Sequence, residues 1–315
     1  MKVFVAGATG VLGKALVPLL TARGHTVIGL ARNPAGHETL RRLGAASREA
    51  NMFDADSLAP AAVGSEVVIH AATAIPLKTR PTSSDWEMND RLRREGTQSL
   101  STAAARIGVR QYLQQSITWL ARPADESFFN EESEPNTDRI TESAWDGERI
   151  AIEAGRRHGF KVGVIRCGMF YGPVSGYTKQ SGELIRRRKF PIVGSGDAIW
   201  SLLHTEDAAS AFVTVAENQR DGLWHVVDDC PVKARDFLTT FARLLKAPPP
   251  RRVPAWLARL IAGSTAVDFL TASTRTANDR FKQEFGWEPR YPSYLEGLEQ
   301  IAAAWREENL SGAGR

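Results

Sequence analysis

The feature that most constrains this fold is the opening segment, a short apolar run followed by three glycines spaced three residues apart. It reads Met1-Lys-Val-Phe-Val-Ala-Gly-Ala-Thr-Gly-Val-Leu-Gly13. The apolar run predicts a strand over Lys2–Ala6, and leucines at helical spacing predict an amphipathic helix to about Arg23. Glycine lets the backbone turn tightly and approach a pyrophosphate, and the start of the next helix favours an anion. The segment therefore predicts a dinucleotide-binding loop with contacts from Gly7, Thr9, Gly10, Val11, Leu12 and Gly13.

The composition is ordinary for a globular protein. Of the 315 residues, 43% are apolar and 24% are charged, and the net charge is only +4. Cys167 and Cys230 have neither metal-ligand spacing nor a disulfide framework, which suits a reducing compartment. No signal peptide precedes the first strand, and no apolar run is long enough to span a bilayer. We therefore expect a cytoplasmic protein with no metal, no nucleic acid and no membrane among its partners.

Strands and helices alternate through the first half of the chain. Strands are expected over Lys2–Ala6, Thr26–Ala31, Val67–Ala71, Tyr112–Ser116 and Lys161–Arg166, and helices over about 86–107 and 141–158. This alternation predicts an α/β fold, a doubly wound parallel sheet of the Rossmann type. The polar loop 121–138 is expected at the surface. A helix over 204–217, capped near Thr205, and a strand over 223–227 follow later in the chain.

After Gly172 the elements become shorter, which predicts a second, smaller region. Residues 1–172 are expected to form the dinucleotide-binding domain, with residues 200–230 returning to it. Residues 173–199 and 231–315 are expected to form a smaller C-terminal region that binds substrate. The cleft between the two, at the carboxyl ends of the strands, is the expected substrate site.

The end of the second strand predicts the nucleotide preference. A carboxylate at this place would bind an adenosine ribose and select NAD, but the sequence has Ala31 followed by Arg32. An arginine here can pair with a 2′-phosphate. We therefore expect NADP(H) as cofactor, with NAD(H) less favoured. The alternative is that Arg32 is a surface residue that caps a turn.

Several motifs, taken in order, resemble the extended short-chain dehydrogenase/reductase family, also called the NAD-dependent epimerase/dehydratase family. They are Gly7-Ala-Thr-Gly10-x-x-Gly13, Asp54 after the third strand, Val68-Ile-His-Ala-Ala72, Gly96-Thr97, Gly108-Val-Arg110, Arg166-x-x-x-x-Tyr-Gly-Pro173, His204-Thr-Glu-Asp207 and Phe285-Gly-Trp-x-Pro-Arg-Tyr-Pro292. The resemblance covers nearly the whole chain. It implies that Asp54 contacts the adenine and that the backbone of Ala71, Ala72 and Thr73 lines the cofactor. It also implies a homodimer through the helices near 86–107 and 141–158.

The catalytic positions depart from that family. Its members carry a tyrosine and a lysine four residues apart on one helix, with a serine or threonine at the end of the fifth strand. The lysine lowers the pKa of the tyrosine, which then exchanges a proton with the substrate. When the chain is matched to these motifs, Trp145 stands at the tyrosine position and Arg149 at the lysine position. Ile117 stands at the serine or threonine position, with Ser116 and Thr118 on either side of it. Tryptophan does not titrate in water and arginine stays protonated, so neither can exchange that proton.

Other groups must then supply any hydrogen bond or proton at the reacting atom. The candidates are Thr118, Ser116, Tyr171, Tyr177 and bound water, although Tyr171 suits a packed turn equally well. Trp145 is expected to form an apolar wall or to stack on a flat substrate, and Arg149 to donate to ribose hydroxyls. Asp146 and Glu148 rank lower, because such residues on a helix are usually exposed to solvent.

Three functions follow from these observations. The first is an NADPH-dependent reductase or related oxidoreductase with non-standard catalytic residues, acting on a small to medium organic substrate. The second is a redox-neutral cyclase, lyase or isomerase, favoured by the loss of both tyrosine and lysine. The third is a non-catalytic NADP sensor. We place the reductase first, and aromatic residues in the expected cleft favour an apolar or aromatic small-molecule substrate.

Overall fold

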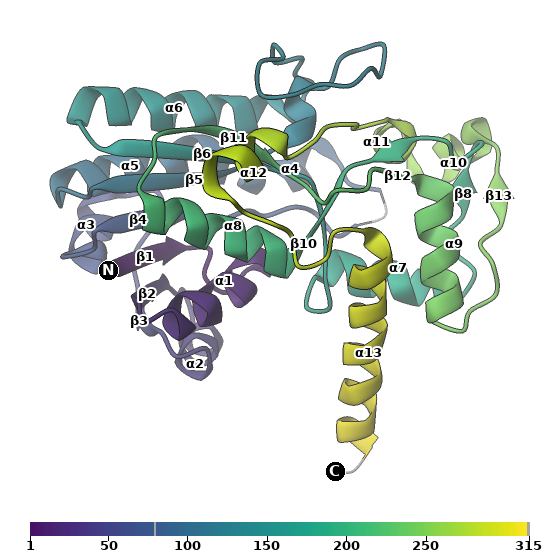
Figure 1. Cartoon of the computed structure of the whole chain (residues 1–315), viewed down its shortest axis with the longest axis horizontal. Coiled ribbons are helices and arrows are strands. Elements are labelled where there is room, and N and C mark those ends of the chain that lie inside the picture. Colours follow the sequence, from purple (N-terminus) through teal and green to yellow (C-terminus); the bar gives the residue numbers. More distant parts are fainter. Residues whose placement is uncertain (79, 314–315) are drawn as a thin grey trace.

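A seven-stranded parallel sheet forms the centre of the computed structural model, which describes residues 1–78 and 80–313 (Figure 1). The strands are β1 (Lys2–Ala6), β2 (Thr26–Leu30), β3 (Ala46–Arg48), β4 (Val67–His70), β5 (Gln111–Ile117), β6 (Lys161–Cys167) and β11 (Gly222–Val226). Their order is β11-β6-β5-β4-β1-β2-β3, and every pairing is parallel. The order reverses between β1 and β4, so the sheet is doubly wound and the predicted Rossmann-type α/β fold is confirmed.

Helices cover both faces of this sheet (Figure 1). One face packs against α1 (Val11–Ala22), α2 (Pro34–Arg42) and α8 (Thr205–Asn218), and the other against α3 (Ala55–Ala62), α5 (Thr97–Arg106) and α6 (Glu142–His158). Successive side chains of a strand enter opposite cores: Leu113 faces the α1–α8 side, whereas Tyr112 faces the α5–α6 side. Both faces are buried, which is why the strands are continuous apolar runs in the sequence.

The helix expected over 86–107 is interrupted. It consists of α4 (Ser83–Arg91), a π-helical turn over Leu92–Gly96, and α5. The buried His70, at the end of β4, contacts this turn: its Nε2 lies 3.1 Å from the Leu92 carbonyl oxygen, and its Nδ1 accepts from Ala72 N at 3.3 Å. Burial lowers the pKa of His70 to about 4, so the ring is neutral and its Nε2–H donates to Leu92. The turn is thereby fixed to the end of the central strand.

The other expected elements agree with the structure, with two corrections. The expected strands match to within one residue at each end. The cap of α8 is His204, not Thr205, because His204 Nδ1 accepts from Glu206 N at 3.3 Å. The loop 121–138 is not wholly at the surface: Phe129 is only 1% exposed, and Glu131 accepts a hydrogen bond from His225 N at 2.8 Å. This loop therefore folds back onto β11.

Most of the remaining elements extend from the carboxyl ends of the strands, whereas the helix Asp279–Phe285 packs against β11 (Figure 1). The remaining elements are β7 (Met169–Tyr171), α7 (Gly176–Arg186), β8 (Ile192–Val193), β9 (Ile199–Trp200), β10 (Leu202–His204), β12 (Val232–Lys233), α9 (Ala234–Leu244), β13 (Arg252–Val253), α10 (Ala255–Ala262), α11 (Ser264–Thr271), α12 (Asp279–Phe285) and α13 (Tyr294–Ala313). Ile185, Phe241 and Trp305 join α7, α9 and α13 in a separate apolar core. Within the described residues, no helix has the length and apolarity needed to cross a bilayer.

Candidate functional site

The glycine-rich loop lies against the backbone that follows β4. Gly7 has a φ of +90°. A Cβ at Gly7 would lie 2.4 Å from the Ala71 carbonyl oxygen and 2.5 Å from Ala72 N. A Cβ at Gly13 would lie 2.3 Å from the Gly7 carbonyl oxygen. Both positions therefore require glycine, and the structure brings the loop together with Ala71 and Ala72.

The start of α1 is open to an anion. The cap residue Gly10 offers no side chain to the first N–H groups, and the first turn contains no acidic residue. Thr9 and Val11 are partly exposed beside this helix start, whereas the Leu12 side chain is buried in the core. Unpaired N–H groups and the helix dipole favour a negative group at such a terminus. The loop therefore fits the pyrophosphate of a dinucleotide.

Two candidates for the adenosine end lie after β2 and before α3. Arg32 is exposed, and no ion pair with it is found in the described part of the chain. Its neighbour Asn33 caps α2 by accepting from Gly36 N at 2.8 Å, so Arg32 is not needed as a cap. Asp54 is exposed and caps α3 by accepting from Asp56 N at 2.9 Å. Thr73 is exposed just after β4. Their contacts with a cofactor stay predictions.

A buried polar network lies at the carboxyl end of β5. Ser116 Oγ donates to Glu148 Oε1 at 2.5 Å. Arg166 donates to both oxygens of the same carboxylate, at 2.9 and 2.7 Å. The side chains of Glu148 and Arg166 are 0% and 2% exposed. Thr118, two residues beyond Ser116, is also buried. The structure thus brings Ser116 and Thr118 to one strand end.

The expectation that Glu148 is exposed to solvent is wrong. Glu148 belongs to the buried residues of α6, which are Ser143, Ala144, Gly147, Glu148, Ala151, Ala154 and Gly155. Gly147 lets the helix approach closely, because a Cβ there would lie 2.7 Å from the Arg93 carbonyl oxygen. Two signals in the sequence point to this pair. The helical spacing of the small residues places Glu148 on the same helix face as they are, and Arg166 is a charged residue within the otherwise apolar strand β6, so that it needs a buried partner of opposite charge.

Trp145 and Arg149 lie outside the buried face of α6. Trp145 is partly buried and packs, as Trp119 does, against an apolar cluster at the end of β5. The Arg166 and Arg149 guanidinium carbons each lie 6.0 Å from its ring centre. The Arg149 side chain is 60% exposed and pairs with Asp146. Its expected contact with a ribose stays a prediction.

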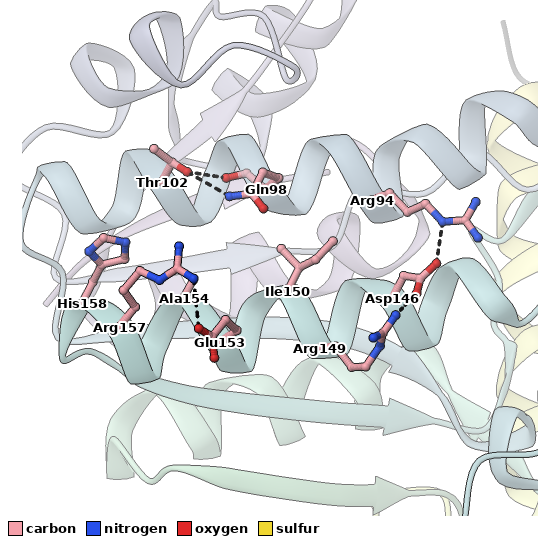
Figure 2. Close-up of a pocket in the computed structure, with 10 residues that line it drawn as sticks. All are labelled: Arg94, Gln98, Thr102, Asp146, Arg149, Ile150, Glu153, Ala154, Arg157 and His158. Carbon is pink, nitrogen blue, oxygen red and sulfur yellow. Dashed lines mark hydrogen bonds and ion pairs between the residues drawn. The ribbon is translucent and has the colours of Figure 1, made fainter.

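Asp146 links α6 to the π-helical turn on the outside of the molecule. It accepts from Arg94 at 2.6 Å and also pairs with Arg149 (Figure 2). Figure 2 shows these residues beside a groove of about 390 Å³ that runs between α5 and α6. The groove follows the two helices and does not reach the glycine-rich loop; Glu153 and Arg157 line its far part.

Tyr171 is not brought to the end of β5. It is 3% exposed, its hydroxyl donates to the Ser293 carbonyl oxygen at 3.4 Å, and its ring packs edge-on against His204 and Phe237. Burial raises the pKa of Tyr171, with neighbouring carboxylates adding to the effect. Tyr171 is therefore a packed residue, which is the alternative that the sequence analysis gave to its role as a proton donor. Among the described residues, no group of three His, Cys, Asp or Glu side chains is arranged to hold a metal ion.

Known proteins resemble this chain over most of its length. The sequence model of the NAD dependent epimerase/dehydratase family matches residues 3–226. A 3-diazoavenalumate denitrifying reductase from a Streptomyces species is 36% identical over 310 residues, which span 95% of this chain and 99% of the relative. Human epimerase family protein SDR39U1, solved with NADPH, is 22% identical with a TM-score of 0.81, covering 96% of this chain and 99% of its own. DesIV, a dTDP-glucose 4,6-dehydratase from Streptomyces venezuelae solved with NAD and TYD, is 20% identical with a TM-score of 0.82, covering 98% and 97%.

The close approach at Gly7 can be tested with two alanine variants. Gly24 also has a positive φ, +79°, but nothing lies within 4 Å of a Cβ placed there. We expect Gly24→Ala to lower the free energy of unfolding by about 1 kcal/mol through backbone strain alone. Gly7→Ala adds a clash with Ala71, so we expect a loss of at least about 2 kcal/mol together with lost nucleotide binding. Denaturant unfolding and a nucleotide titration measure both effects, and equal losses in the two variants would contradict this account.

Proposed function

The chain belongs to the NAD dependent epimerase/dehydratase family, and from this premise we propose that it is an NADPH-dependent reductase that removes nitrogen from an aromatic diazo compound. Homologues named as reductases support an oxidoreductase on this fold. The observation that carries the proposal is the 36% identity to the denitrifying reductase across nearly the full length of both chains. Fold alone would not choose a reaction, since this fold hosts many.

The substituted catalytic positions support this reaction. A carbonyl reduction leaves an alkoxide that needs a proton, which is why a titratable group beside the substrate matters. When a reduced nicotinamide is bound, its hydride can replace a diazonium group: the new C–H bond forms, the C–N bond breaks, and its electron pair leaves with dinitrogen. No proton is transferred in that exchange. Trp145 and Arg149, which cannot exchange protons, are therefore compatible with it.

The side chains at the end of β5 suit a flat aromatic substrate. Trp119 and Phe269 meet edge to face, with ring centres 5.9 Å apart. Trp145 packs against the same apolar cluster as Trp119. Aromatic walls hold planar rings by stacking and by edge contacts. We propose that the elements over 173–199 and 231–313 complete this substrate site, and that Trp145 forms its wall.

The cofactor assignment rests on the glycine-rich loop and on Arg32. The close approach of Gly7 to Ala71 and the open start of α1 fit a dinucleotide pyrophosphate. One structurally similar protein was solved with NADPH and another with NAD, which supports a nicotinamide cofactor. The preference for NADP(H) over NAD(H) therefore rests on Arg32. We propose NADP(H), with Arg32 on the 2′-phosphate, Asp54 near the adenine and Ala71–Thr73 along the cofactor.

We also propose a homodimer through α5 and α6. Arginines and acids alternate along the groove between these helices, where Arg94 and Arg149 share Asp146 and Arg157 pairs with Glu153 at 3.0 Å. Such a surface offers complementary charges to a second copy of itself.

The reaction is tested by incubating the protein with NADPH and 3-diazoavenalumate, the compound in the relative's name. We expect loss of the nicotinamide absorbance with release of an equal amount of dinitrogen, because each hydride displaces one nitrogen molecule. Oxidation of NADPH by a panel of ketones, with no nitrogen released, would instead make the protein an ordinary carbonyl reductase. Substrate conversion without loss of NADPH would favour the redox-neutral alternative.

The cofactor preference is tested by titration with NADPH and NADH, followed by energy transfer from tryptophan to the nicotinamide. Charge-assisted hydrogen bonds are worth about 1.5–3 kcal/mol, so Arg32→Ala should weaken NADPH binding at least about tenfold and leave NADH binding within about twofold. Arg42→Ala is the control, because Arg42 is also exposed and pairs with Glu38 on α2. Equal losses for NADPH and NADH would remove Arg32 from the phosphate site.

A further inference from the structure

The short helix α10 has its small side chains facing the fold and its large apolar side chains facing solvent. Ala258 is 5% exposed and belongs to a small apolar cluster with Val267 of α11. Trp256, Leu260 and Ile261 are instead 65%, 67% and 66% exposed. At about 100° per residue, these three side chains spread over about 140° of the helix surface. A continuous exposed apolar face of this kind marks a surface that binds another body.

Two segments that meet at β8 and β13, one of which contains α10, carry charged side chains of almost one sign. Residues 184–196 and 243–267 contain nine lysines and arginines and no aspartate or glutamate. Since the whole chain has a net charge of +4, its remainder is net negative. The parallel pairing of β8 with β13 holds the two segments together, and Ile192 N donates to the Arg251 carbonyl oxygen at 2.8 Å. Positive charge is therefore concentrated around α10, at the end of the molecule where β13 and α9 also lie (Figure 1).

Most of these nine cations have no anionic partner within the fold. Arg259 pairs with Asp268 at 2.9 Å, and the Arg186 guanidinium carbon lies 5.6 Å from the ring centre of Trp305. In the part of the chain that the structure describes, no ion pair engages the other seven, and all seven are exposed. The surface around α10 can therefore attract an anionic body without first giving up an ion pair.

We propose that α10 and these seven cations form a docking surface for an anionic lipid bilayer. Trp256, Leu260 and Ile261 enter the interfacial layer, and the cations meet the lipid phosphates. The proposal goes beyond the proposed function and does not depend on the reaction. It departs from the expectation of no membrane partner, which rested on the length of the apolar runs. Binding at the surface of a bilayer needs no spanning run, only an exposed apolar face with positive charge beside it.

A bilayer fits this surface better than a protein or a nucleic acid does. The apolar face of α10 is convex, so a protein would need a groove shaped to receive it, whereas lipid chains adapt to it. The seven cations lie on three separate segments, at the ends of α7 and α9 and at the start of β13. A fluid layer of phosphates meets such cations in any arrangement. A nucleic acid can also meet them, but it leaves Leu260 and Ile261 in water.

The test is sedimentation of the full chain with vesicles made of equal parts of phosphatidylglycerol and phosphatidylcholine, and with vesicles of phosphatidylcholine alone. We expect saturable binding to the anionic vesicles that weakens as salt is added, and at least about tenfold weaker binding to the neutral ones. Leu260→Gln with Ile261→Gln removes apolar contact, and Arg251→Gln with Arg252→Gln removes two charges. Each double variant should bind the anionic vesicles at least about tenfold more weakly than the wild type. The assay uses neither substrate nor NADPH, so its outcome is separate from that of the proposed function.

Two control variants carry the same kinds of change elsewhere. Val63→Gln with Leu295→Gln replaces exposed apolar side chains outside α10, and Arg41→Gln with Arg42→Gln removes two charges from α2, at the opposite end of the molecule (Figure 1). We expect both to bind within about twofold of the wild type, because groups far from the lipid contribute little through screening solvent.

Equal losses in the test and control variants, or equal binding to the two kinds of vesicle, would overturn the docking surface. Failure to bind the anionic vesicles would overturn the bilayer as its partner. Salt-sensitive binding of poly-glutamate or of duplex DNA would then assign the surface to an acidic protein or to a nucleic acid.

Discussion

The site depends on one close backbone approach, between Gly7 at the end of β1 and the Ala71–Ala72 peptide after β4. No side chain fits between them, since a Cβ on Gly7 would lie 2.4 Å from the Ala71 carbonyl oxygen. The approach sets the loop directly before α1, whose first N–H groups face outward uncapped. It also joins the two halves of the sheet at the point where the strand order reverses, which is where doubly wound folds bind their ligands.

The sequence predicted the sheet and the glycine-rich loop well, because both depend on short-range patterns. Buried parallel strands are continuous apolar runs, and three spaced glycines after the first run leave few alternatives. It was wrong about Glu148, because charged residues were assigned to solvent by type and not by helix face. The π-helical turn over Leu92–Gly96 was not foreseen either. It depends on the contact of His70 with Leu92, between residues that lie far apart in the sequence.

The chemistry available at the carboxyl end of β5 depends on which side chains there can donate a proton. We propose that Trp145 and Arg149 stand where the family carries the pair that exchanges protons; the Ser116 hydroxyl donates to Glu148. We propose that this strand end positions a flat substrate; among the described residues around it, Trp145 and Arg149 supply no acid that could complete a carbonyl reduction. Displacement of dinitrogen by hydride requires no such acid, so the proposed departures from the family and the activity named for the Streptomyces relative both support the reaction that we propose.

The most direct test of this account is the fate of the hydride. The protein is incubated with an aromatic diazo substrate and NADPH that carries deuterium at the transferred position of the nicotinamide, in ordinary water. The account predicts a product with one deuterium on the ring carbon that bore the nitrogen. Deuterium absent from that carbon, with hydrogen taken from water instead, would contradict direct hydride displacement and with it the proposed function.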